Sequence, residues 1–154
     1  TDLSVIRDLP ETENEKLELK SSVVIIGLNG TGPSGNAGVW RNFHSTSSGP
    51  DTRLKKFFNN SRFRGACMID VFKTRSEKTL DVKRIPRAEL DLNFALLKEE
   101  LDILDWNNSP GRLMIALGKK AYDLLKSSYD VKWIWHPASS KTDLDIEDDI
   151  RRIG

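Results

Sequence analysis

Cysteine is almost absent from this sequence. Cys67 is the only one among 154 residues, which excludes a disulfide framework and any zinc or iron-sulfur site that needs four thiolates. A lone thiol fits a reducing compartment. Long apolar runs are also missing, because no segment approaches the roughly 18 residues that a membrane helix needs, and no charged-then-apolar leader opens the chain. We therefore expect a soluble, intracellular and cytoplasmic protein of bacterial or phage-like type, with no membrane partner.

The sequence also lacks an excess of charge of either sign. The chain has 24 Lys plus Arg against 23 Asp plus Glu, a formal net charge of +1, so the total charge argues neither for nor against a polyanionic partner. The distribution is uneven, since both ends are acidic and the segment 53–87 is rich in Lys and Arg. If these cations share a face, they would attract phosphates. The alternative is an ordinary solvated surface with salt-bridged helices.

The length and the 38% hydrophobic content suit one compact domain that folds without disulfides or metal. Residues 1–20 are polar and acidic, and Pro10 interrupts them, so we interpret them as a lead-in segment with at most a short helix or turn. Residues 21–154 are interpreted as a single domain.

Short apolar runs alternate with amphipathic segments along that domain. Strands are predicted at residues 22–28, 65–73, 112–118 and 130–137. Helices are predicted at residues 51–60, 87–106, 119–128 and 143–153. This alternation predicts an α/β three-layer sandwich, in which helices cover both faces of a central, mostly parallel four-stranded sheet. Ligands of such folds bind beyond the carboxyl ends of the strands.

Polar residues stand at three of those predicted strand ends. Asn29 follows the first strand, Asp70 and Lys73 end the second, and His136 follows the fourth. Each has an ordinary explanation when taken alone, as a loop hydrogen bond, a cap or salt bridge, or a turn residue before a proline. Together, at one edge of one sheet, they favour a common site.

The glycine-rich loop after the first strand raises the possibility of a phosphate site. The segment "GLNGTGPSG", residues 27–35, lacks the Gly-Lys-Ser/Thr ending of a nucleoside-triphosphate loop. It contains a Gly-x-Gly-x-x-Gly match, "GTGPSG", but Pro33 stands where the helix of a dinucleotide-binding fold should open. Neither cofactor loop is therefore favoured.

Four motifs resemble those of the uracil-DNA glycosylase superfamily, especially its mismatch-specific and single-strand-selective branches. "GLNGTGPSG" resembles the first motif, Gly-x-Asn-Pro-Gly, and "HPASS", residues 136–140, resembles the second, His-Pro-Ser or Asn-Pro-Ser. Between them, "MIDVFKTRS" and "LMIALGKKAYDLL" are similar to the middle strand and to the third strand with its helix. The resemblance implies a glycosylase-like α/β fold and base-excision repair chemistry.

The resemblance also implies roles for individual residues. Asn29 would position the attacking water, and His136 would donate a hydrogen bond to the base oxygen that gains negative charge. An amide cannot take the proton of water as a carboxylate can, so slower catalysis than in Asp-bearing relatives is expected. Phe43, or failing that Trp40, would stack on the flipped base, although either ring could serve only core packing.

Further residues of these motifs would contact the base and the DNA backbone. The base contacts would come from Leu28 and Asp70 beside Phe43. The residues expected to bind DNA are Ser34, Lys73, Arg75, Ser139, Ser140 and Lys141, with Lys141 where relatives place a wedge that enters the vacated stack. No metal and no organic cofactor is implied. We expect a monomer whose partner is single-stranded or mismatched DNA with a flipped base.

Three positions depart from the family pattern. Gly30 stands where the first motif has Pro, which makes the water-binding loop less rigid. Asp70 stands where several branches use Asn to read the base edge, and since a carboxylate only accepts hydrogen bonds, it would favour bases that present N–H donors or else face away from the base. Ala138 replaces a Ser of the second motif and removes a possible phosphate contact.

The sequence thus predicts a DNA glycosylase-like hydrolase that cleaves the N-glycosidic bond of uracil or another damaged or mispaired base. Two alternatives stay open. One is a non-catalytic nucleic-acid or nucleotide binding domain of the same fold. The other is a protein interaction module, which would show no salt-dependent DNA binding.

Overall fold

The computed structural model describes residues 6–7, 22–29, 57–58, 63–74, 80–136 and 141–153. The strands in this part of the chain are β1 (Ile6–Arg7), β2 (Val23–Asn29), β3 (Ala66–Phe72), β4 (Leu113–Leu117) and β5 (Lys132–Ile134). The α-helices are α3 (Arg87–Ile103), α4 (Lys119–Leu125) and α5 (Asp143–Ile153), with short 3₁₀ helices η2 (Val82–Arg84) and η3 (Trp106–Asn108). Phe57 and Phe58 are also helical.

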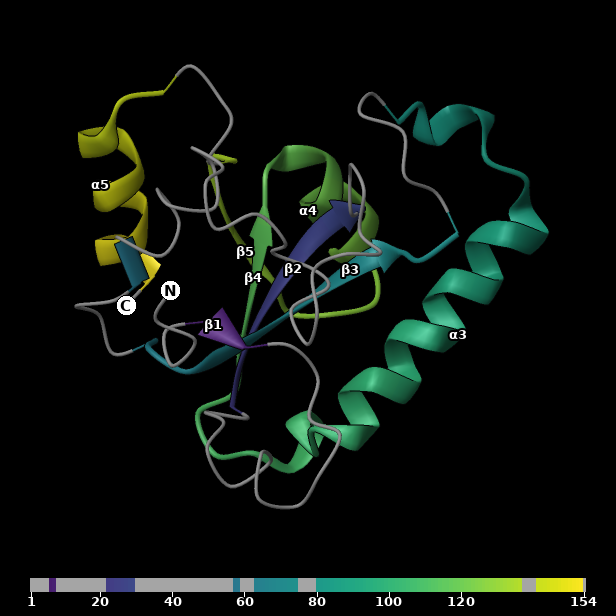
Figure 1. The fold of residues 1–154 in the computed structure, drawn as a ribbon, viewed down its shortest axis with the longest axis horizontal. Coiled ribbons are helices and arrows are strands. Elements are labelled where there is room, and N and C mark those ends of the chain that lie inside the picture. Colours follow the sequence, from purple (N-terminus) through teal and green to yellow (C-terminus); the bar gives the residue numbers. More distant parts are fainter. Residues whose placement is uncertain are drawn as a thin grey trace.

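The strands form one sheet in the order β1-β3-β2-β4-β5, and every neighbouring pair is parallel (Figure 1). In the register of the three central strands, Ile25 of β2 lies between Met68 of β3 and Ile115 of β4. All of β3 and most of β2 are buried. Continuous apolar runs of this kind form the interior strands of a parallel sheet because helices cover both of its faces.

Helices α3 and α4 cover one face. Strand residues Val24, Ile69 and Met114 point to this side and are buried with Leu97 of α3 and Leu125 of α4. The apolar stripe of α3 follows helical spacing: Leu97, Leu101 and Leu104 are buried, and Leu90 and Phe94 pack beside them.

Helix α5 and the helical pair Phe57 and Phe58 cover the other face. Ile146 and Ile150 of α5 are buried in one cluster with the alternate strand residues, which include Ile25, Met68 and Ile115. Figure 1 shows α5 and α3 on opposite sides of the sheet. The domain therefore has three layers, with the sheet in the middle.

The predicted α/β class and its parallel sheet are confirmed, and the four predicted strands are all present. The predicted helix 143–153 has the observed bounds of α5. The prediction did not include β1. Ile6 and Arg7 pair with the start of β3, so part of the segment interpreted as a lead-in joins the sheet.

The second predicted helix ends earlier than expected. Helix α3 stops at Ile103, and Asp105 then adopts a left-handed conformation with φ of 53°. This reversal brings Trp106 back onto the core, where its indole Nε1 donates to Leu113 O at 3.3 Å. Burying the largest side chain of the segment outweighs the cost of one strained residue.

Candidate functional site

The order of the strands creates a topological switch point between β2 and β4. The chain runs from β2 to its neighbour β3 on one side, and from β4 to its neighbour β5 on the other. Connections that leave two adjacent parallel strands in opposite directions open a crevice at their carboxyl ends, and this is the usual ligand position of open α/β sheets. The residues that follow β2, β4 and β5 are therefore the first to consider.

Asn29 is the last residue of β2, and its side chain is partly buried. Alternation along the strand places it on the same side as Val23 and Ile25, which is the α5 side. Leu28 points to the opposite side and packs against the α3–α4 cluster. The two predicted site residues of this strand end thus face different layers.

His136 lies beside the end of β4. An added Cβ on Gly118, the residue that follows β4, would be 3.6 Å from the His136 Cβ. Gly118 N donates to Ile134 O at 2.8 Å, which ties the two strand ends together. Continuing the β2–β4 register beyond Ile26 and Ala116 puts Leu28 opposite Gly118. The structure therefore brings Asn29 and His136 to the two flanks of the β4 end.

Gly118 is required by its backbone conformation. Its φ of +89° is rare for residues with a side chain, whereas an added Cβ would meet the His136 Cβ at an ordinary van der Waals distance. The His136 side chain keeps an exposed surface, yet neighbouring protein atoms remove part of its hydration and lower its pKa below the ordinary 6.5. Loss of hydration disfavours the charged ring, which favours the neutral form, and the neutral ring has one N–H to donate.

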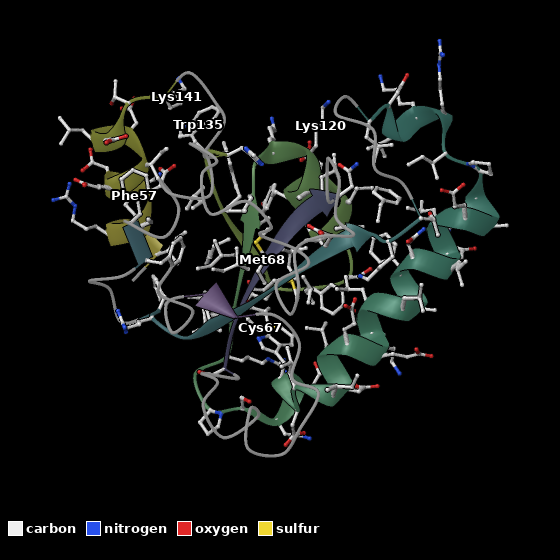
Figure 2. All side chains as sticks on the ribbon, viewed as in Figure 1. Phe57, Cys67, Met68, Lys120, Trp135 and Lys141 are labelled. Atoms are coloured by element: carbon white, nitrogen blue, oxygen red, sulfur yellow. The ribbon has the colours of Figure 1, made fainter. Side chains whose placement is uncertain are left out.

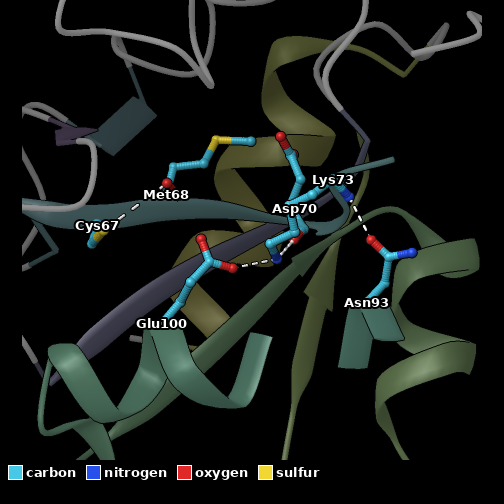
Figure 3. Close-up of polar contacts among 6 residues, drawn as sticks. All are labelled: Cys67, Met68, Asp70, Lys73, Asn93 and Glu100. Carbon is cyan, nitrogen blue, oxygen red and sulfur yellow. Dashed lines mark hydrogen bonds and ion pairs between the residues drawn. The ribbon is translucent and has the colours of Figure 1, made fainter. Parts of the chain in front are cut away.

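Asp70 lies near the end of β3, directly opposite Gly27 in the sheet. Its side chain is buried, and its Oδ1 lies 2.5 Å from the position that a Cβ on Gly27 would take. Figure 3 shows the Asp70 carboxylate and Met68 on one side of β3, with Glu100 of α3 on the other. The Asp70 carboxylate is therefore on the same side of the sheet as Asn29, which is two residues after Gly27 on β2.

Lys73 has protein partners in the structure. Its Nζ donates to Asp70 O and forms an ion pair with Glu100, and its backbone N donates to the buried Asn93 Oδ1 at 2.7 Å (Figure 3). Asn93 Nδ2 in turn donates to Thr74 Oγ1 at 3.0 Å and to Glu89 O at 2.8 Å. This network fixes the segment that leaves β3, and it holds the predicted DNA-binding cation against α3.

Lys141 lies on the α5 side of the β5 end. Its Nζ is 4.4 Å from the centre of the Trp135 ring, a cation–π geometry. The Trp135 ring also meets Trp133 edge to face, with centroids 5.0 Å apart. Figure 2 shows Trp135 and Lys141 together, and Lys120 on the helix that follows β4. The carboxyl edge thus carries exposed cations after both β4 and β5.

Several predicted residues lie outside the described part of the chain. They are Ser34, Phe43, Arg75, Ser139 and Ser140, together with the alternative stacking residue Trp40. Of the predicted set, the structure therefore places Leu28, Asn29, Asp70, Lys73, His136 and Lys141, and it brings Asn29, Asp70 and His136 to one edge of the sheet.

Sequence reasoning missed three residues that shape this edge: Gly118, Asn93 and Asp149. Gly118 had a signal, because a glycine that directly follows a buried strand often takes a positive φ. Asn93 also had one, since it is polar between the apolar positions Leu90 and Leu97 of an amphipathic helix. Asp149 lies in an acidic run that pattern alone assigns to solvent, yet it is buried.

Among the residues described, no group of three or more His, Cys, Asp and Glu side chains could hold a metal ion. No helix in the same part of the chain is long and apolar enough to cross a membrane. Comparison with models of known families and with curated protein sequences finds no match for this chain. The candidate site therefore has to be interpreted from its own geometry and from the motifs themselves.

Proposed function

We propose that this protein is a DNA glycosylase of the uracil-DNA glycosylase type, which hydrolyses the N-glycosidic bond of uracil or another damaged or mispaired base. The observation that carries the proposal is the placement of Asn29 and His136 on the two flanks of the β4 end, at the switch point of the sheet. These are the two residues to which the motif resemblance gives the chemical steps.

The chemistry of this bond needs what the two side chains can supply. The base leaves with a developing negative charge, while the sugar gains oxocarbenium character and water adds. A neutral His136 can donate its N–H to the oxygen that becomes negative, and this contact is stronger in the transition state than in the ground state. Asn29 can orient the water through its amide but cannot accept its proton. Catalysis then depends on leaving-group stabilisation more than on base catalysis.

The carboxyl edge also has features that suit a DNA strand. A flipped nucleotide must be held by its flanking phosphates. The exposed Lys120 follows β4, and the exposed Lys141 follows β5, the strand that also precedes His136. Lys73 would have to exchange its Glu100 partner to reach a phosphate. We therefore assign the backbone contacts first to Lys120 and Lys141.

The test is a strand-cleavage assay on labelled oligonucleotides with one deoxyuridine, deoxyinosine or deoxyxanthosine, as single strands and as mismatched duplexes, with a thymine mismatch included. Alkali-labile sites should form with at least one substrate. Asn29→Ala and His136→Ala should each lower the rate by about tenfold or more. Asn107→Ala, an exposed amide at the opposite edge of the sheet, should leave it unchanged.

Absence of cleavage on every substrate would overturn the proposal. If salt-dependent binding to the oligonucleotides persisted in that case, the protein would be a nucleic-acid binding domain of this fold. If binding were absent too, an interaction module would be the better interpretation.

A further inference from the structure

Asp149 is a buried carboxylate whose position next to the candidate site has no explanation in the motifs. It lies on α5 between the buried residues Ile146 and Ile150, and the residue as a whole is 5% exposed. Burying an ionised carboxylate costs free energy unless partners compensate for the lost hydration. Among the described residues, Asp149 has two such partners, and one of them connects the helix to the strand end before His136.

The first partner is the backbone of Trp135. Its N–H donates to Asp149 Oδ2 at 3.2 Å. The last residue pair of β4 and β5 is Leu117 and Ile134, so Trp135 lies just beyond the ladder. A backbone N–H in a partly buried segment needs an acceptor, and α5 provides it at the residue immediately before His136.

The second partner is Arg152, which forms an ion pair with Asp149 from the solvent side of the helix. The Arg152 side chain is 74% exposed, whereas that of Asp149 is 7% exposed. The cation therefore compensates the carboxylate charge from the solvent side, while the bond to Trp135 N joins α5 to the segment that carries His136.

Two further contacts hold the Trp135 ring. Lys141 lies over the ring and Trp133 meets it edge to face. With the ring and the backbone N–H both held, the direction in which the chain leaves β5 is determined, and so is the point from which His136 extends beside Gly118. A hydrogen-bonding group must be held within a fraction of an ångström to act in a transition state.

We propose that Asp149 is a positioning residue, which fixes His136 at the carboxyl edge through its hydrogen bond to Trp135 N. Its catalytic consequence depends on the proposed glycosylase function, but the positioning itself can be measured without any substrate. Asp149 does not contact the reacting atoms in this scheme. It acts on them through the backbone of residues 135 and 136.

The test uses three variants of the whole chain. Asp149→Leu removes the acceptor and keeps the branched outline of the side chain, and because the Arg152 that it leaves behind is exposed, no buried charge is left unpaired. Asp149→Asn keeps an acceptor oxygen without the charge. Asp148→Leu is the matched control, because Asp148 is the preceding residue and pairs with Arg151 in the same way while both side chains are exposed. Circular dichroism checks whether each variant is folded.

The first readout is the NMR titration of the His136 ring, which is easily assigned because the chain has two histidines. In Asp149→Leu, His136 should gain hydration and its titration midpoint should rise toward 6.5. Removal of the negative charge of Asp149 would by itself lower the midpoint. Lost positioning of His136 therefore gives a rise, and lost charge alone gives a fall. Asp149→Asn and Asp148→Leu should show no rise.

A folded Asp149→Leu protein with an unchanged or lowered midpoint would overturn the proposal. So would an equal rise in Asp149→Asn, because the acceptor is kept there. If Asp149→Leu does not fold, hydrogen exchange at the Trp135 amide of Asp149→Asn decides instead. Protection close to that of wild type supports the proposal, because the acceptor is kept. Exchange as fast as in an unfolded segment would overturn the proposal.

The second readout is steady-state cleavage of the best substrate. Asp149→Leu should lower kcat by roughly tenfold with little change in KM, while Asp149→Asn and Asp148→Leu stay near wild type. An unchanged kcat in Asp149→Leu would contradict the catalytic consequence. If wild type cleaves nothing, the proposed function fails, and the NMR titration still decides whether Asp149 positions His136.

Discussion

Gly27 and Asp70 lie opposite each other in the sheet, and the carboxylate occupies the space that a side chain on Gly27 would need. A Cβ there would lie 2.5 Å from Asp70 Oδ1 and 2.9 Å from Met68 Cε, both closer than atoms tolerate. The Met68 tip can move aside, but Asp70 is short and buried. The glycine at the start of the first motif is therefore explained by packing beside the site and needs no contact with a ligand.

This explanation predicts the cost of adding one methyl group. Gly27→Ala should destabilise the protein by about 1–3 kcal/mol through overpacking, and the cost should fall in an Asp70→Ala background, because neighbouring sites couple. Urea unfolding of wild type, of the two single variants and of the double variant measures the cost of Gly27→Ala in both backgrounds. Gly111→Ala is the control: its φ of +65° is strained but nothing lies within 4 Å, so its cost should be the same in both backgrounds. Equal costs for Gly27→Ala in the two backgrounds would refute the packing explanation.

At the same scale, the sequence indicated Asn29 and His136 as site residues because polar residues at parallel strand ends must meet at one edge. It could not indicate which way Asp70 points, since that depends on the absence of a side chain on a neighbouring strand. The burial of Asp149 was equally hidden. Its acidic run has the composition of a solvated surface, and only the packing of α5 against β5 shows that one member of the run turns inward.

At the scale of elements, the segment that leaves β3 is fastened to α3 by one side chain. Asn93 is fully buried and joins Lys73 N, Thr74 Oγ1 and Glu89 O. The amide both donates and accepts, which a carboxylate or a hydroxyl could not do with the same partners. The strand end next to the candidate site therefore depends on a helix residue about 20 positions later in the chain.

Replacement of this amide should loosen the strand end. Asn93→Leu leaves the Lys73 N–H without its acceptor, and we expect a loss of about 1–3 kcal/mol, together with faster hydrogen exchange of the Lys73 amide than elsewhere in β3. Exchange followed by NMR, with urea unfolding, measures both. Asn108→Leu removes an exposed amide that bonds only Asp105 among the contacts described, and should change neither. Wild-type protection at Lys73 in Asn93→Leu would show that the network does not hold this segment.

The elements themselves were largely predictable because their signals are local. Continuous β-branched and apolar runs mark β2, β3 and β4, and helical spacing of leucines marks α3. The exceptions were decided by tertiary contacts. β1 has two residues and exists only through its pairing with β3, and α3 ends early because Trp106 turns back to the core.

At the scale of the molecule, the strand order was not available from the sequence. Alternating strands and helices predict a parallel sheet with sites at its carboxyl edge, but no local signal states that β2 lies between β3 and β4. That order makes the β2–β4 boundary the switch point, with Asn29 at the end of β2 and His136 beside the end of β4. The cations also lie in different places: some, such as Lys120, are on the carboxyl edge, and others, such as Lys98, are on the outer face of α3.

The chain has almost no net charge, so its total field does not attract a polyanion. It can bind DNA only through a local group of cations, such as those at the carboxyl edge. Affinity for a single-stranded oligonucleotide should fall steeply with salt, and each lost phosphate contact should reduce the slope of log K against log salt by about 0.7. Lys120→Ala and Lys141→Ala should each show this reduction in a fluorescence anisotropy titration. Lys98→Ala removes the same charge from a side chain that is 73% exposed on α3, and the slope should stay as in wild type. Equal effects of all three substitutions would mean that the protein attracts DNA through a diffuse field, and the carboxyl edge would then lose its claim to be the binding surface.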